Sequence, residues 1–205
     1  MDIKDTYKTI STATEEVLFK DKNSKFFGYA FPISSEEEAK QHLERLKKQH
    51  HSARHWCYAW QIGVKKIRFR ANDDGEPSNS AGQPIYGQVQ SFELTNVLVV
   101  VVRYFGGVKL GVGGLINAYK RAAQLALETS DIIEKTIDVD FLIIFEYKDM
   151  NKVMRIIKEH QLKITRQELE LNCNIYISVR KTVADKINSF FSALYEVTIK
   201  ELENQ

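Results

Sequence analysis

The segment that decides the fold begins at Val97, ends at Gly114 and reads VLVVVVRYFGGVKLGVGG. Its first part is an almost continuous run of β-branched residues, which predicts that residues 96–105 form a strand buried on both faces. Five glycines follow within nine residues, from Gly106 to Gly114. The apolar residues of the next segment, 115–129, recur at helical spacing. The expected arrangement is therefore a buried strand, a glycine-rich loop and a helix.

This loop has the features of an anion site. Glycines permit positive φ angles and allow a ligand to approach the backbone closely. The helix that follows presents unpaired amides and the positive end of its dipole. Arg103 and Lys109 bracket the loop. The glycine order matches neither a P-loop nor a dinucleotide fingerprint, so a tight turn whose glycines serve close packing is the open alternative.

A second motif, Asp73-Asp74-Gly75-Glu76-Pro77-Ser78, lies in a loop predicted over residues 72–84. Its three carboxylates suit Mg²⁺, which prefers oxygen ligands, or contact with an amine or a nucleobase edge. Asp, Gly and Pro are also ordinary turn residues, and a solvated β-turn is the favoured interpretation. Apart from this Mg²⁺ hypothesis, the sequence predicts no cofactor.

Two further clusters have chemical potential. The residue types of His50, His51, His55 and Cys57 suit zinc, but no second Cys/His pair completes four ligands. A buried structural Cys57 is favoured over a nucleophile activated by His55, because Trp56, Tyr58 and Trp60 mark a packed strand. The other cluster is Lys65, Lys66, Arg68 and Arg70, which would form either a phosphate-binding or a solvated strand edge.

The remaining chain divides into two regions. The first contains a hairpin over residues 16–31, a helix over 36–49 begun by a capping box at Ser35, strands at 56–62 and 65–70, and a short helix within 83–92. After Ile133 the order becomes strand, helix, strand, strand, helix, strand. This βαββαβ order is typical of a ferredoxin-like domain.

Composition limits the functional classes. The chain has 205 residues, 43% of them hydrophobic, and a net charge of only +2, with a mild basic surplus in residues 1–135. Its two cysteines lie far apart and its first residues are polar, so we expect a reduced, cytosolic protein. The longest apolar run, residues 97–102, is too short to cross a bilayer, so no membrane partner is predicted.

Three ordered motifs resemble those of the YigZ/IMPACT family. They are Ala53-Arg54-His55-Trp56-Cys57-Tyr58-Ala59, then Asp73–Ser78 with Ala81-Gly82-Gln83-Pro84, then Val102–Gly111. One departure is Asn79-Ser80, where the family has Gly-Thr. Asn tolerates the left-handed region, so we expect this turn to be preserved.

The resemblance implies an α+β fold of two domains. Residues 1–133 would form a mixed-sheet domain similar to domain IV of elongation factor G and to RNase PH. Residues 134–205 would form a ferredoxin-like domain similar to domain V of that factor. It also implies a non-enzymatic, translation-associated regulator that binds RNA or a ribosomal or translation-factor surface through the first domain.

No catalytic or metal-binding residue is assigned. The predicted ligand-binding residues come from all three motifs: Arg54, His55, Asp74, Glu76, Ser78, Arg103, Tyr104, Gly106, Gly107, Lys109, Gly111 and Gly114. Two alternatives stay open. One is a hydrolase for a small phosphorylated or anionic substrate, with Asp74 or Glu76 as base or Mg²⁺ ligand and His55 as proton shuttle. The other is an interaction module that works through the second domain.

Overall fold

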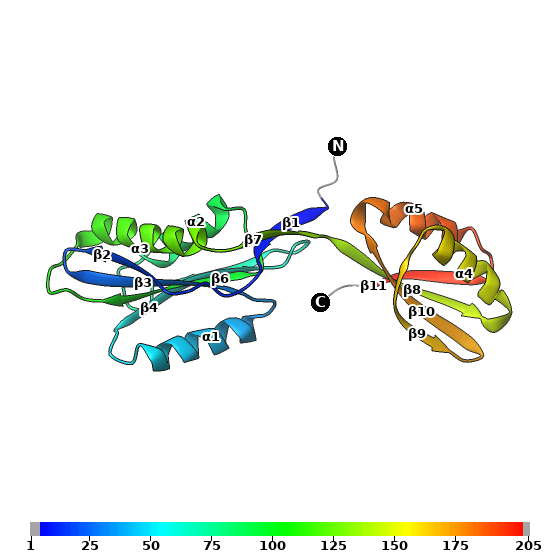
Figure 1. The fold of residues 1–205 in the computed structure, drawn as a ribbon, viewed down its shortest axis with the longest axis horizontal. Helices are drawn as coiled ribbons and strands as arrows, with labels where there is room; N and C mark the ends of the chain where they lie inside the picture. The colour runs from blue at the N-terminus through cyan, green and yellow to red at the C-terminus, as the bar shows by residue number, and fades with distance from the viewer. Residues whose placement is uncertain (1–4, 203–205) are drawn as a thin grey trace. The chain divides into compact units, whose positions relative to one another are not determined.

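The computed structural model describes residues 5–202, which form two compact units (Figure 1). The first unit spans Tyr7–Lys135, and the second joins the described residues from Thr136 onward with Asp5 and Thr6. The division lies two residues beyond the predicted boundary between 133 and 134. Each unit has a hydrophobic core of its own.

The first unit is a five-stranded sheet with helices on both faces. Helix α1 (Glu36–Gln49) covers one face, and helices α2 (Gly82–Ser91) and α3 (Gly111–Glu128) cover the other (Figure 1). The strands are ordered β2 (Val17–Asp21), β3 (Ser24–Pro32), β6 (Val97–Tyr104), β4 (His55–Ile62) and β5 (Arg68–Asn72). Strands β1 (Thr6–Ile10) and β7 (Ile132–Thr136) form a separate pair.

The expectation of a mixed sheet is wrong for these five strands. Every neighbouring pair is antiparallel. A parallel bridge joins Lys8 of β1 to Leu94, outside these five strands. An unbroken β-branched run like that of β6 is typical of parallel sheets, but its actual requirement is burial on both faces.

Strand β6 meets that requirement because it is the central strand. Val97, Val99 and Val101 pack into the core beneath α2 and α3, whereas Leu98, Val100 and Val102 pack into the core beneath α1. All six are fully buried. The predicted doubly buried strand is therefore confirmed.

Helix α1 has the predicted bounds and the predicted cap. The Ser35 hydroxyl accepts a hydrogen bond from the Glu38 amide at 3.2 Å. The Glu38 carboxylate returns to the Ser34 amide at 2.7 Å, one residue before the position that a strict capping box would use.

Two boundaries differ from the sequence prediction. Helix α3 begins at Gly111, four residues before the expected start, so part of the predicted glycine loop is the first helical turn. Strand β5 begins at Arg68 rather than Lys65, because its pairing with β4 starts at Ile62 opposite Arg68. In both cases tertiary packing sets the boundary, and local propensity does not.

The second unit has the predicted βαββαβ order. It consists of β8 (Asp138–Glu146), α4 (Met150–Glu159) after a 3-10 turn at Tyr147–Asp149, β9 (Lys163–Leu169), β10 (Asn172–Arg180), α5 (Lys181–Ser192) and β11 (Val197–Leu202). The antiparallel sheet order is β11-β8-β10-β9. Alternate residues of β8 and β10 form its core with the two helices, which confirms the predicted period of two.

Candidate functional site

The acidic turn after β5 is organised by Asp73. One of its carboxylate oxygens accepts the amides of Ala81 at 2.9 Å and Gly82 at 2.8 Å, and the other accepts the amide of Asn79 at 2.9 Å. The amides of Ala81 and Gly82 lie at the start of α2, where helical hydrogen bonds are missing. Asp73 therefore acts as the cap of α2 from a distance in sequence. Asn79 has a φ of 61°, so the expected left-handed turn is present.

Asp74 extends the β4–β5 ladder with its side chain. Its carboxylate accepts the Trp56 amide at 2.8 Å, beyond the last backbone pair of Tyr58 with Asn72. Its carbonyl lies 2.9 Å from His55 Nδ1. His55 is thus oriented by the backbone of the turn.

Glu76 forms a buried ion pair with Arg103. Glu76 Oε1 lies 2.6 Å from Arg103 Nη1, and the two side chains are only 4% and 7% exposed. The same oxygen accepts the hydroxyl of Tyr119 at 2.7 Å. Because Arg103 lies on β6 and Tyr119 on α3, Glu76 ties the acidic turn to the central strand and to the helix after the glycines.

Arg103 is also enclosed by aromatic rings. Its guanidinium carbon lies 5.5 Å from the ring centre of Phe26 and 5.6 Å from that of Phe105. Its Nε is buried without a hydrogen-bond partner among the described residues. Arg103 therefore supports the site from beneath, and its charge is directed at Glu76.

Cys57 lies beneath the same turn and is fully buried. Its thiol donates to the Asp73 carbonyl at 2.9 Å. Burial, above all, raises the pKa of Cys57 well above its usual range, and the nearby carboxylates act in the same direction. Burial likewise raises the pKa of Tyr119. Cys57 is therefore a buried packing residue, as the sequence favoured, and burial disfavours its thiolate form.

The carboxylates and histidines do not assemble into a metal centre. Within residues 5–202, no group of three or more His, Cys, Asp and Glu side chains is placed to hold a metal ion. Asp73, Asp74 and Glu76 are each engaged by different donors. His50, named in the zinc hypothesis, instead lies between two tyrosines, with its Nε2 2.5 Å from the Tyr29 hydroxyl and its Nδ1 3.0 Å from the Tyr104 hydroxyl.

The glycines beyond β6 fall into two groups, those that close packing confines and those that face open space. Gly106 and Gly114 belong to the first group, since a Cβ on Gly114 would lie 3.0 Å from Leu110 Cβ. A Cβ on Gly106 would lie 2.0 Å from the backbone of Asn23, so this glycine allows close packing on the β2–β3 turn. At Gly107, Gly111 and Gly113 an added Cβ would meet no atom within 4 Å. Gly107 and Gly111 have positive φ angles. Gly113 has neither constraint, so the fold itself does not require glycine there.

The surface around these open glycines is apolar and carries one cation. Phe105, Val108 and Val112 are 54%, 46% and 53% exposed, and Lys109 is also exposed. Leu110, the residue at the start of α3, makes no side-chain capping hydrogen bond, and the first amides of an α-helix have no partner within the helix. We call this region, residues 105–114, the junction surface.

The structure brings together some predicted site residues and separates others. His55, Asp74, Glu76 and Arg103 converge beneath the acidic turn. Tyr104 faces the opposite side of the sheet and binds His50. Arg54 and Ser78 are exposed. The rest belong to the junction surface: Gly106, Gly107, Lys109, Gly111 and Gly114.

Sequence reasoning missed two residues that organise the site. The sequence places Asp73 in a solvated β-turn or in a site for Mg²⁺, an amine or a nucleobase edge, although an Asp followed by a turn and a helix start is also a signal for capping. Tyr119 was assigned to the apolar face of α3, and its hydroxyl partner could not be foreseen.

No helix among the described residues is long and apolar enough to cross a membrane.

Comparison with known proteins agrees with these motifs. The Impact N-terminal domain family matches residues 22–127. The IMPACT family member YvyE of Bacillus subtilis is 32% identical over 195 residues, which cover 94% of this chain and 87% of that protein.

Two solved structures are also similar. A crystal structure of a hypothetical protein covers 99% of this chain and 100% of its own, with a TM-score of 0.73 and 23% identity, and so shares the fold. The two-domain translational regulator Yih1 is 28% identical, covering 58% of this chain and 46% of its own, with a TM-score of 0.37. The matched residues include the acidic turn and the junction surface, and the match to YvyE extends over both units. This chain belongs to the IMPACT family.

Proposed function

We propose that this protein is a non-enzymatic, translation-associated regulator whose first unit binds RNA or a ribosomal or translation-factor surface at the junction surface. The association with translation comes from the family, since Yih1 is described as a translational regulator. Similarity of the two units to domains IV and V of elongation factor G stays a prediction.

The observation that carries the choice of surface is the open space above Gly107, Gly111 and Gly113. Glycine destabilises a helix relative to alanine. At Gly113 neither a positive φ angle nor close packing requires glycine. A partner that approaches the backbone closely would explain why glycine stands at this position. The amides at the start of α3, which lack helical partners, and the exposed Lys109 ammonium favour an anionic partner such as phosphate.

The roles proposed for the arginines differ accordingly. Arg54 is exposed and is available to a phosphate. Arg103 is buried against Glu76, and its role is to hold the acidic turn and β6 together beneath the surface. Since each carboxylate of the turn already accepts hydrogen bonds from the protein, the arrangement supports binding rather than hydrolysis.

The test is cosedimentation of the intact protein with ribosomes and with ribosomal RNA over a range of salt concentrations. We expect Lys109→Glu to weaken binding at least tenfold and to reduce its salt dependence, because a phosphate contact is replaced by repulsion. Lys158→Glu, which changes an exposed lysine of the second unit, is the matched control and should bind as the unchanged protein does. Equal binding by both variants would contradict the assignment to the junction surface.

A further inference from the structure

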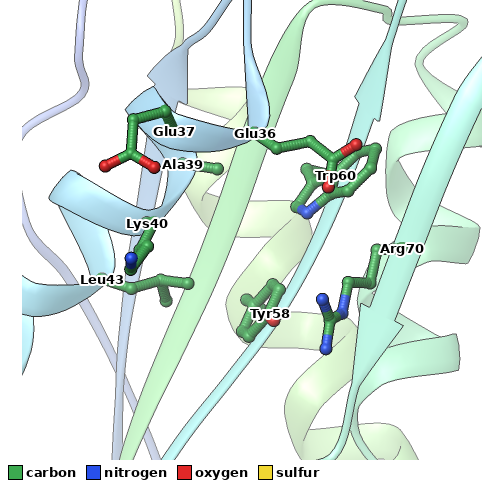
Figure 2. A pocket seen from close by; sticks show the side chains of 8 residues that line it. All are labelled: Glu36, Glu37, Ala39, Lys40, Leu43, Tyr58, Trp60 and Arg70. Atoms are coloured by element: carbon green, nitrogen blue, oxygen red, sulfur yellow. The ribbon is translucent and has the colours of Figure 1, made fainter.

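The opposite face of the first sheet carries a groove between α1 and β5. It has a volume of about 280 Å³. Lys40 and Leu43 of α1 form one wall, Tyr58 and Trp60 of β4 form the floor, and Arg70 of β5 forms the other wall. Figure 2 shows the Arg70 side chain reaching from β5 toward Tyr58. None of these five residues takes part in the junction surface.

The floor belongs to an aromatic row on β4. Trp56, Tyr58 and Trp60 alternate along the strand and share the face that packs toward α1. Neighbouring members of such a row lie about 7 Å apart along a strand. Trp60 is 5% exposed, whereas Tyr58 and Trp56 are half-buried. Lys47 places its Nζ 5.6 Å from the ring centre of Trp56.

The charges along this row leave a positive surplus. Lys40 and Arg70 are exposed and form no ion pair with any residue between 5 and 202. Of the two carboxylates at the end of the groove, Glu36 is neutralised by Arg68 at 2.8 Å, and only Glu37 remains. Uncompensated cations beside aromatic rings are the combination that binds a phosphate chain together with its bases.

We propose that this groove binds single-stranded RNA, with phosphates at Lys40 and Arg70 and a base against Tyr58. The inference rests on the RNA form of the proposed function and adds a second contact on the other face of the first unit. An acidic peptide would satisfy the two cations, but it would leave the aromatic row without a matching group. The aromatic row therefore favours RNA.

The chain itself supplies the probe for this inference. It contains two tryptophans, Trp56 and Trp60, and both lie in the aromatic row. Intrinsic tryptophan fluorescence of the intact protein therefore reports directly on the groove. Titration with a short oligouridylate should quench this fluorescence saturably, and the affinity should fall as salt rises.

Variants then separate the groove from the junction surface. The double change Lys40→Ala with Arg70→Ala should weaken oligouridylate binding at least tenfold and reduce the slope of log affinity against log salt by about 1.4, since two phosphate contacts are lost. Arg70→Lys should retain most of the affinity because the charge is kept. Lys158→Ala, an exposed lysine of the second unit, should change neither quantity.

The possible outcomes distinguish binding in the groove from binding at the junction surface. Binding that is lost in Lys109→Glu but unchanged in the groove variants would overturn the groove and leave the proposed function standing. The reverse result would establish the groove and overturn the junction assignment. If polyglutamate at the same concentration also quenches the tryptophan fluorescence and displaces the RNA, the RNA inference is overturned in favour of an acidic peptide. Absence of any oligouridylate binding would overturn it as well, while ribosome cosedimentation would still test the proposed function.

Discussion

At the scale of single residues, the Glu76–Arg103 pair dominates the centre of the first unit. Both side chains are buried, and Tyr119 donates to the same carboxylate. A buried ion pair is costly to form, but removing one partner leaves the other charge without compensation. The pair therefore fixes the position of the acidic turn relative to β6 and α3 without requiring that the turn itself bind anything.

We expect Glu76→Gln to lower the free energy of unfolding by about 3 kcal/mol, because Arg103 would remain buried and charged beside a neutral amide. Urea denaturation monitored by circular dichroism measures this free energy of unfolding. The control is the double change Glu76→Gln with Arg103→Met, which removes the buried charge and should recover part of the loss. A single variant as stable as the unchanged protein would mean that the pair is not buried in solution.

The histidine beside the tyrosines gives a second residue-scale prediction. Burial holds the pKa of His50 below its ordinary value of 6.5, although Glu16, 3.7 Å away, acts in the opposite direction. The unfolded chain therefore binds a proton at a higher pH than the folded protein. His50 favours folding above pH 6.5, and that contribution is lost as the pH falls through the lower, folded-state pKa.

Denaturation at pH 7.5 and at pH 5.5 should accordingly show a less stable protein at the lower pH. Part of this difference should disappear in His50→Gln, which cannot titrate. Because burial also lowers the pKa of His42, the same measurement on His42→Gln separates the two histidines. A pH dependence that is identical in the unchanged protein and in His50→Gln would rule out a contribution from His50.

At the scale of elements, the turn from β6 into α3 contains glycines that serve different purposes. Gly106 lies against the backbone of Asn23, whereas Gly113 faces open space within the first turn of α3. Glycine at position 106 is required by the packing of two turns, whereas nothing in the fold explains glycine at position 113.

We therefore expect opposite effects from the same substitution. Gly106→Ala should destabilise the protein by several kcal/mol, because the new methyl group would meet backbone atoms that cannot move independently. Gly113→Ala should raise stability by up to about 1 kcal/mol through helix propensity, yet weaken ribosome or RNA binding. Thermal unfolding and cosedimentation of the two variants test this. Unchanged binding by Gly113→Ala would show that no partner approaches closely there.

The sequence predicted elements well where one physical signal decided them. Helix α1 followed from Ser35 and an apolar stripe, and β6 followed from its β-branched run. The start of α3 could not be predicted, because glycine disfavours helix and only the packing of later residues such as Leu115 and Ala118 extends the helix to Gly111. The bridge from Glu76 to Arg103 and Tyr119 also escaped prediction, since it joins three segments that only the folded chain brings together.

The fold brings part of the predicted residue set together, and its role as a binding site stays a prediction. His55, Asp74, Glu76 and Arg103 do converge, as three ordered motifs suggested, but their contacts are to one another and to backbone. Whether a polar group faces inward or outward depends on strand register. The register places Arg103 opposite His55 and turns Tyr104 to the other face.

At the scale of the whole molecule, the two units carry separate cores. We expect a fragment of residues 1–136, which retains β7 as the partner of β1, to fold by itself. It should unfold cooperatively on heating and keep most of the ribosome and RNA affinity of the intact protein. Loss of all binding in a folded fragment would instead favour an interaction module in residues 136–205.

The proposed contact between residues 105–114 and the translation machinery can be tested by hydrogen exchange of the intact protein with and without purified ribosomes. The amides at the start of α3 lack helical partners and should exchange rapidly in the free protein. We expect ribosomes to slow exchange within residues 105–114. Ribosome binding that leaves these amides unprotected, or that protects only residues 136–202, would contradict it.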